Sequence, residues 1–282
     1  MHTIDRALVL GPGGVVGTAW AAGLAHGLRR AGVDLGGADL IVGTSAGAIV
    51  GAVLATGQDP GRLATVPRRP EHRVTPDPEL MGRVFGVLGE GGLEPGEARR
   101  RVGRLALDAT VPGAEEALIA GRAALIGADA WPERHLVITA VDASTGEPVV
   151  WDRDSGVPLV SAVAASSAFP GAAPPVTVGG RRYMDGALRA GLNADLAVGA
   201  RTLVVVDPMA HQFPEGRADQ QVAGVGARTV VTLSPDPASV EAFGPDLGDV
   251  AAWEPAYRAG LRQAGDVDPH LRSVWEAAAE AG

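Results

Sequence analysis

The stretch Leu40-Ile41-Val42-Gly43-Thr44-Ser45-Ala46-Gly47-Ala48 decides the fold class of this chain. Its three leading apolar residues predict a short buried strand, and the Gly- and Ala-rich run at 48–56 predicts a buried helix. Between them, Gly-Thr-Ser-Ala-Gly matches the Gly-x-Ser-x-Gly pattern of a sharp strand-to-helix turn, in which flanking glycines leave the serine clear. Ser45 is therefore the candidate nucleophile. The simpler alternative is a glycine turn in which Ser45 only caps the helix.

A second unit of the same kind precedes this one. The apolar run at 7–10 predicts a buried strand, and Gly11-Pro12-Gly13-Gly14 ends it. A helix is expected at 17–30, where large apolar residues recur every four positions: Trp20, Leu24 and Leu28. The order strand, helix, strand, helix predicts an α/β fold, a three-layer α/β/α sandwich with a mostly parallel central sheet.

The rest of the chain continues this pattern after an interruption. Prolines punctuate residues 58–132, which we interpret as a helical insertion or lid containing an arginine-rich helix at 95–108. The later segments predict further strands and helices. We expect strands at 136–141, 148–151, 203–206 and 229–233, a helix at 158–169, a hairpin at 174–183 and a helix-rich tail from 253. A length of 282 residues suits a single domain, 1–282.

Composition excludes several classes of function. The chain has no cysteine, and all 24 basic residues are arginine, so thiol catalysis, a P-loop lysine and Schiff-base chemistry are ruled out. A net charge of −9 argues against nucleic-acid binding. No cluster of histidine and carboxylate residues has metal-ligand spacing, so we predict neither a metal nor another cofactor.

The sequence also suggests where the protein acts. The N-terminal residues 1–6 lack the features of a secretory signal, and the longest apolar region is too short to span a membrane. We therefore expect a cytoplasmic protein that contacts a membrane or micelle transiently through apolar residues. Nothing in the sequence indicates an oligomeric state.

A serine nucleophile also needs hydrogen-bond donors to the oxyanion, and a glycine-rich loop is the candidate source: Gly11-Pro12-Gly13-Gly14-Val15-Val16-Gly17. Backbone without side chains at a strand end and helix start can direct N–H groups at a developing oxyanion. A dinucleotide-binding loop is the alternative. That function requires an acidic residue at the end of the second strand, where this chain has Gly43-Thr44-Ser45.

The base is less evident from the residues alone. His211 or His270 would complete a Ser-acid-His triad, although neither lies in a glycine-flanked loop of the kind that exposes catalytic groups. Asp185 does, in Met184-Asp185-Gly186-Ala187 at the exit of a predicted strand.

Several of these motifs together resemble the patatin-like phospholipases. In the family's order, they are the glycine loop at 11–17, Gly43-Thr44-Ser45-Ala46-Gly47-Ala48, the segment 165–171, and Asp185-Gly186-Ala187 followed by 193–197. The resemblance implies a Ser-Asp dyad without histidine, formed by Ser45 and Asp185. It assigns the oxyanion loop to Gly13 and Gly14, and other motif glycines support these residues: Gly11, Gly17, Gly43, Gly47 and Gly186.

Two positions depart from the family pattern: Pro12 replaces a usual glycine, and Val16 a usual arginine or lysine. The resemblance predicts a serine acyl-ester hydrolase of the lipid esterase, lysophospholipase or phospholipase A type, with an acyl-lipid or ester substrate. Because Val16 carries no charge, we expect neutral esters and lysolipids to be cleaved at least as well as diacyl phospholipids. An acyltransferase or thioesterase of the same fold and a catalytically silent lipid-binding protein are the alternatives.

Overall fold

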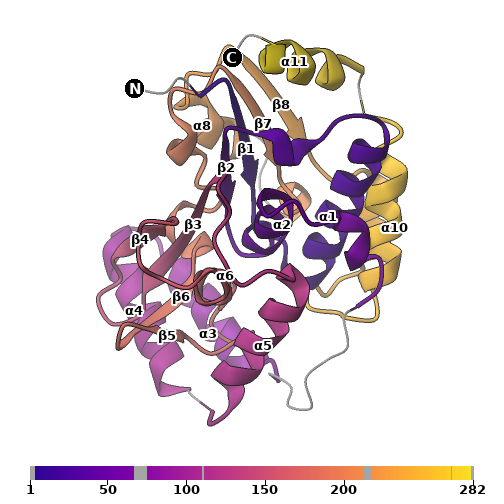
Figure 1. Ribbon diagram of the computed structural model, residues 1–282. Coiled ribbons are helices and arrows are strands. Elements are labelled where there is room, and N and C mark those ends of the chain that lie inside the picture. The colour runs from indigo at the N-terminus through magenta and orange to yellow at the C-terminus, as the bar shows by residue number, and fades with distance from the viewer. Residues whose placement is uncertain (1–3, 67–74, 110, 213–216, 268, 281–282) are drawn as a thin grey trace.

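A computed structural model describes residues 4–66, 75–109, 111–212, 217–267 and 269–280 of the chain (Figure 1). Their strands form one 8-stranded sheet with the order β5-β6-β3-β2-β1-β7-β8, and β4 pairs with β3. The strands are β1 Arg6–Leu10, β2 Leu40–Gly43, β3 His135–Asp142, β4 Pro148–Trp151, β5 Val176–Val178, β6 Arg181–Asp185, β7 Thr202–Val206 and β8 Thr229–Leu233.

The parallel part of the sheet creates the place for a site. β1 lies between β2 and β7 and is parallel to both, with Leu10 in register with Gly43 on one side and Val206 on the other. From β1 the chain passes first to β2 and later to β7 on the opposite side. The carboxyl ends of strands at such a reversal point form the usual binding crevice of an α/β sheet.

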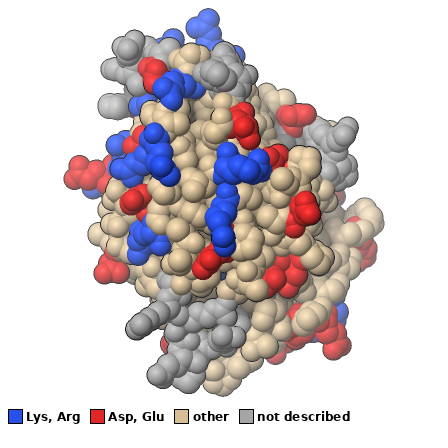
Figure 2. Space-filling view, turned by 90° about the vertical axis from the view of Figure 1, so that its right-hand side faces the viewer, with Lys and Arg blue, Asp and Glu red and all other residues tan. Residues whose placement is uncertain are grey.

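Helices cover both faces of this sheet, which confirms the predicted fold class. On one face, buried residues of β1 such as Leu8 share an apolar core with α1 (Gly14–Arg30), α2 (Ala46–Ala55) and α10 (Trp253–Gln263), and α10 packs on α1. On the other face, Val9 packs against η3 (Ala194–Ala197) and an apolar residue of α8 (Arg217–Ala223). The face around α10 carries interspersed arginine and acidic side chains (Figure 2).

Residues 58–132 are largely helical where the structure describes them. They contain η2 (Pro60–Leu63), α3 (Pro78–Leu88), α4 (Pro95–Asp108) and α5 (Ala114–Ile126). Apolar residues of α3 and α4 pack against the ends of β3 and β6, whereas α5 contacts α2 and α6 (Leu159–Ser166) (Figure 1). The remaining elements are short or peripheral: η1 Leu35–Gly37, α7 Ala187–Ala190, η4 Ala210–Gln212, α9 Pro237–Phe243 and α11 Pro269–Glu280.

Several boundaries differ from those expected. The first two helices begin earlier, at Gly14 and Ala46, because each starts directly from its glycine turn. The helix expected at 158–169 ends at Ser166, where the Ser167 N–H bonds back to the last turn and the chain leaves the helix. Within the described ranges, no helix is both long and apolar enough to cross a membrane.

Candidate active site

Ser45 lies in the tight turn between β2 and α2. Its backbone has φ 56° and ψ −114°, a conformation that costs free energy in residues other than glycine. The turn is fixed to the end of β1, because the Thr44 N–H donates to the Leu10 carbonyl at 3.0 Å and the Gly47 N–H to the Gly11 carbonyl at 3.1 Å. Only glycine fits at position 47, since a Cβ there would lie 2.0 Å from the Leu10 oxygen. The packing thus maintains the strained turn.

The Ser45 hydroxyl faces a carboxylate from a distant strand. Ser45 Oγ donates to Asp185 Oδ2 at 2.7 Å. Asp185 is the last residue of β6, and its Oδ1 accepts the Ala187 N–H at 2.8 Å. Both partners are buried, with 9% of Ser45 and 1% of Asp185 exposed. The structure therefore brings together the two residues that the sequence indicated.

Burial changes the acidity of Asp185. Loss of hydration raises its pKa to about 7, although the Ala187 N–H, the Ser45 hydroxyl and the positive charge of Arg122 each lower it. A general base works best when its pKa lies near the working pH, because it is then both ionised and able to hold a proton. The Asp185 carboxylate meets this condition at neutral pH.

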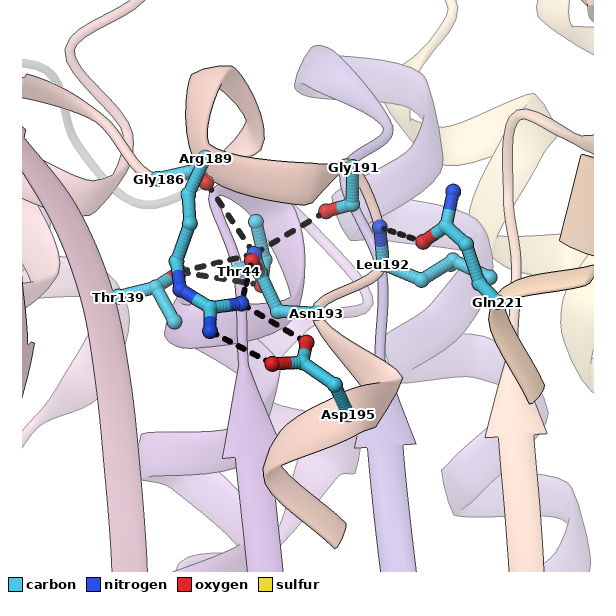
Figure 3. Close-up of polar contacts among 9 residues, drawn as sticks. All are labelled: Thr44, Thr139, Gly186, Arg189, Gly191, Leu192, Asn193, Asp195 and Gln221. Carbon is cyan, nitrogen blue, oxygen red and sulfur yellow. Dashed lines mark hydrogen bonds and ion pairs between the residues drawn. The ribbon is translucent and has the colours of Figure 1, made fainter. Parts of the chain in front are cut away.

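Asn193 connects the two halves of the site. Its Nδ2 lies 2.9 Å from Thr44 Oγ1 and 3.1 Å from the Gly186 carbonyl oxygen (Figure 3). Thr44 precedes Ser45, and Gly186 follows Asp185. One fully buried amide thus bonds the residue next to each member of the Ser-Asp pair, through a side chain at Thr44 and the backbone at Gly186.

A second layer of contacts holds Asn193 itself. Its backbone has φ 58°, which asparagine tolerates better than most residues, and its Oδ1 accepts from Arg189 at 2.9 Å. Arg189 also binds Asp195 through both guanidinium Nη groups, at 2.8 and 2.6 Å (Figure 3). Asn193 Nδ2 additionally reaches Thr139 Oγ1 at 3.2 Å, and a Cβ on Gly186 would lie 2.2 Å from that oxygen.

The glycine loop after β1 is covered by the segment that precedes α10. The N–H groups of Val15 and Val16 donate to the Leu247 carbonyl at 2.8 and 3.3 Å. Within the described ranges, the N–H groups of Gly13 and Gly14 have no protein acceptor. Gly14 has φ 62°, and a Cβ there would lie 2.7 Å from the Leu247 oxygen. A Cβ would also clash at the other motif glycines, Gly11, Gly17 and Gly43.

Comparison with known proteins identifies the family. The family model described as patatin-like phospholipase matches residues 8–198, a range that contains every residue of the site except Leu247. The chain belongs to the patatin-like phospholipase family. It is therefore a member of a family of hydrolases that act on carboxylic ester bonds of lipids. No curated protein sequence matches it.

Two solved structures resemble this patatin-like chain at low identity. VipD from Legionella pneumophila aligns with 12% identity and a TM-score of 0.41, over 94% of this chain and 67% of that one. The type III effector protein ExoU aligns with 16% identity and a TM-score of 0.40, over 97% of this chain and 54% of that one. The chain thus spans only about half the length of ExoU.

The histidines named as candidate bases are not at this patatin-like site where the structure describes them. His211 lies in η4, hydrogen-bonds Gln212 and packs on Phe243 with the ring centroids 5.8 Å apart. Burial lowers its pKa. The side chain of His270 lies outside the described residues. In the described part of the chain, no three His, Cys, Asp or Glu side chains are grouped to hold a metal ion.

Sequence reasoning missed Arg122 and the roles of Asn193 and Leu247. Arg122 belongs to α5, and its Nε donates to Ser167 Oγ at 2.7 Å. Burial lowers its pKa to about 10, which leaves it cationic at neutral pH. Asn193 lies in a motif that the family resemblance includes, which was its one available signal. Arg122 and Leu247 carry no sequence signal, because they are far along the chain from the motifs that they approach.

Proposed function

We propose that this chain is a serine acyl-ester hydrolase of the lysophospholipase or phospholipase A type, with Ser45 as nucleophile and Asp185 as general base. The observation that carries the proposal is the 2.7 Å hydrogen bond from Ser45 Oγ to Asp185 Oδ2, in a buried turn of a patatin-like chain. A serine on a strained turn, bonded to a base whose pKa is near 7, is suited to attack an ester.

The reaction proceeds in two stages. Asp185 takes the Ser45 proton as Oγ bonds to the ester carbonyl carbon, and the carbonyl electron pair moves to oxygen. When the tetrahedral intermediate collapses, the bond to the leaving alkoxide breaks and Asp185 returns the proton to it. Water then attacks the acyl-serine, with Asp185 first as base and then as acid, releasing a fatty acid and regenerating Ser45.

Gly13 and Gly14 are the proposed donors to the oxyanion. Their N–H groups are free of protein acceptors within the described ranges, whereas the next two along the loop are bound by the Leu247 carbonyl. Preorganised N–H donors of this kind stabilise the developing negative charge without reorganisation. Pro12 contributes no donor, so the proposed hole depends on the two glycines.

The segment 58–132 fits the role of an insertion that meets lipid. Phe85 of α3 is 57% exposed and Leu88 is 41% exposed. The Phe85 ring lies 5.5 Å from that of Phe169, whose neighbour Ala168 accepts the Asp185 N–H. An apolar surface adjoining the site in this way would contact lipid and act as a lid.

Labelling and hydrolysis together test the proposal. Wild-type protein should react with a fluorophosphonate probe at Ser45 and hydrolyse p-nitrophenyl esters, and Ser45→Ala should lose both with its fold intact. His211→Ala should retain activity if no histidine participates. Labelling without hydrolysis, but with acyl transfer to an added alcohol or thiol, would indicate a transferase. An unlabelled, inactive wild type would support a silent lipid-binding protein.

A further inference from the structure

The position of Arg122 in α5 is unusual for an arginine. Leu118 and Leu125, four residues before it and three after it, are buried in the main core, so Arg122 lies on the packed stripe of the helix rather than on its outer face. A cation on such a stripe costs free energy unless an anion or several acceptors compensate for it. Arg122 therefore needs an anion or hydrogen-bond acceptors to offset the cost of its position.

The protein supplies part of that compensation, through one hydrogen bond to a neutral hydroxyl and the attraction of the Asp185 charge beyond ion-pair distance. Arg122 Nε donates to Ser167 Oγ, and that neutral hydroxyl gives its own proton to the Val163 carbonyl at 2.9 Å. No carboxylate lies within ion-pair distance of Arg122 among the residues that the structure describes. Its Nη groups make no hydrogen bond to these residues, and they are not among the enclosed polar atoms that lack a partner. They remain open to a ligand.

This cation adjoins the Ser-Asp pair. Ser166, the neighbour of Ser167, accepts the Ser45 N–H on its Oγ at 3.0 Å, and the next residue, Ala168, accepts the Asp185 N–H at 3.1 Å. The short segment 166–168, at the end of α6, thus contacts Arg122 on one side and both members of the pair on the other.

We propose that Arg122 binds an anionic group, a phosphate or a carboxylate, carried by the ester substrate near its scissile bond. A guanidinium held by its Nε presents a fork of N–H donors that matches either anion. Arg122 would supply from α5 the positive charge that Val16 does not supply from the glycine loop. It would thus favour acidic substrates over the neutral ones that the sequence alone led us to expect. The inference rests on the proposed esterase function.

Matched substrate pairs test this role and distinguish the two anions. One pair is a monoacylglycerol and its 3-phosphate. The other is a short-chain p-nitrophenyl alkanoate and its analogue with a terminal carboxylate, which then lies only a few bonds from the ester. Each pair has equal chain length. Arg122→Gln should lower kcat/KM for an acidic member by about ten- to a hundredfold relative to its neutral partner. Arg122→Lys, which keeps the charge but loses the fork, should restore part of the preference.

The pattern of losses assigns one anion, both anions or neither. A loss confined to the phosphate pair assigns phosphate, one confined to the carboxylate pair assigns carboxylate, and a loss in both assigns their shared chemistry. Equal losses on acidic and neutral members, with a displaced pH midpoint, would show that Arg122 only adjusts Asp185 and would overturn the inference. Inorganic phosphate or acetate should also inhibit neutral-ester hydrolysis by wild type competitively, which needs no variant, and no inhibition by either would contradict it. If wild type hydrolyses neither the acidic nor the neutral member of any pair, it is the proposed function that fails.

Discussion

Asp185→Asn should inactivate the protein and yet stabilise it above neutral pH. The pKa of Asp185 is raised from an ordinary 3.8 to about 7 by burial. At about 1.4 kcal/mol per pKa unit, the ionised form therefore costs the folded state about 4 kcal/mol. Because the folded pKa lies above the unfolded one, the stabilising effect of the protonated acid is complete below about pH 4 and is lost as pH rises through about 7.

Asparagine fits the same contacts without that dependence on pH. Its Oδ1 can accept the Ala187 N–H, and its Nδ2 can donate to Ser45 Oγ, so both hydrogen-bond positions stay occupied. Relative to wild type, the free energy of unfolding of Asp185→Asn should rise by about 4 kcal/mol between about pH 4 and about pH 8. Any constant effect of the substitution cancels in this difference.

Urea unfolding of both proteins across this pH range measures the effect. Ser45→Ala is the matched control, since it is equally inactive in the proposed mechanism but keeps the carboxylate. It should lose stability with rising pH at least as much as wild type does, because it lacks the hydroxyl that lowers the Asp185 pKa. The kcat/KM of wild type on a neutral ester should rise with pH to a plateau with a midpoint near 7, as Asp185 ionises. Parallel stability curves for Asp185→Asn and wild type would refute the assignment of a buried, high-pKa base.

Three further substitutions test other parts of the site. Asn193→Gly, which keeps the positive φ and removes only the amide, should cost about 2–3 kcal/mol of stability and lower kcat, and unchanged activity would contradict its positioning role. Gly14→Ala should lower kcat by about 100-fold or more by disturbing an oxyanion donor, whereas Gly57→Ala, at φ 73° with open space, should show only a loss of stability. Leu88→Asp should slow hydrolysis of vesicle lipid but not of a soluble ester, and the control Val198→Asp, at a 59% exposed residue beside η3, should slow neither.

The sequence predicted those parts of the molecule that depend on local chemistry. Strands can be recognised as short apolar runs, so β4 and β8 were located at their observed bounds, although only the last residue of each is buried. Gly47 could be recognised from the local Gly-x-Ser-x-Gly pattern, although the atom that excludes a Cβ there belongs to Leu10 of β1. The Ser45 and Asp185 motifs flank predicted strands, which indicated that they lie at strand ends but left their separation undetermined.

The features that could not be predicted from the sequence depend on packing between segments far apart in the chain. The Leu247 carbonyl binds N–H groups more than two hundred residues earlier in the chain, and no periodicity encodes such a pairing. Arg122 occupies a helix stripe that a sequence pattern assigns to apolar residues, so its inward orientation is visible only when α5 is packed against α6. The acidity of Asp185 likewise depends on burial by elements that lie on either side of it in sequence.

The burial that makes Asp185 a useful base also makes the site expensive to fold. The ionised carboxylate and the strained Ser45 backbone each raise the free energy of the folded state. Asn193 offsets part of this cost, because its amide bonds the turn before the serine and the turn after the aspartate at once. Loss of the Asn193 amide should therefore separate Ser45 from Asp185 while the sheet stays folded. In Asn193→Gly, the midpoint of the pH–rate profile should then move toward the ordinary aspartate value as water enters, while the wild-type protein keeps it near 7.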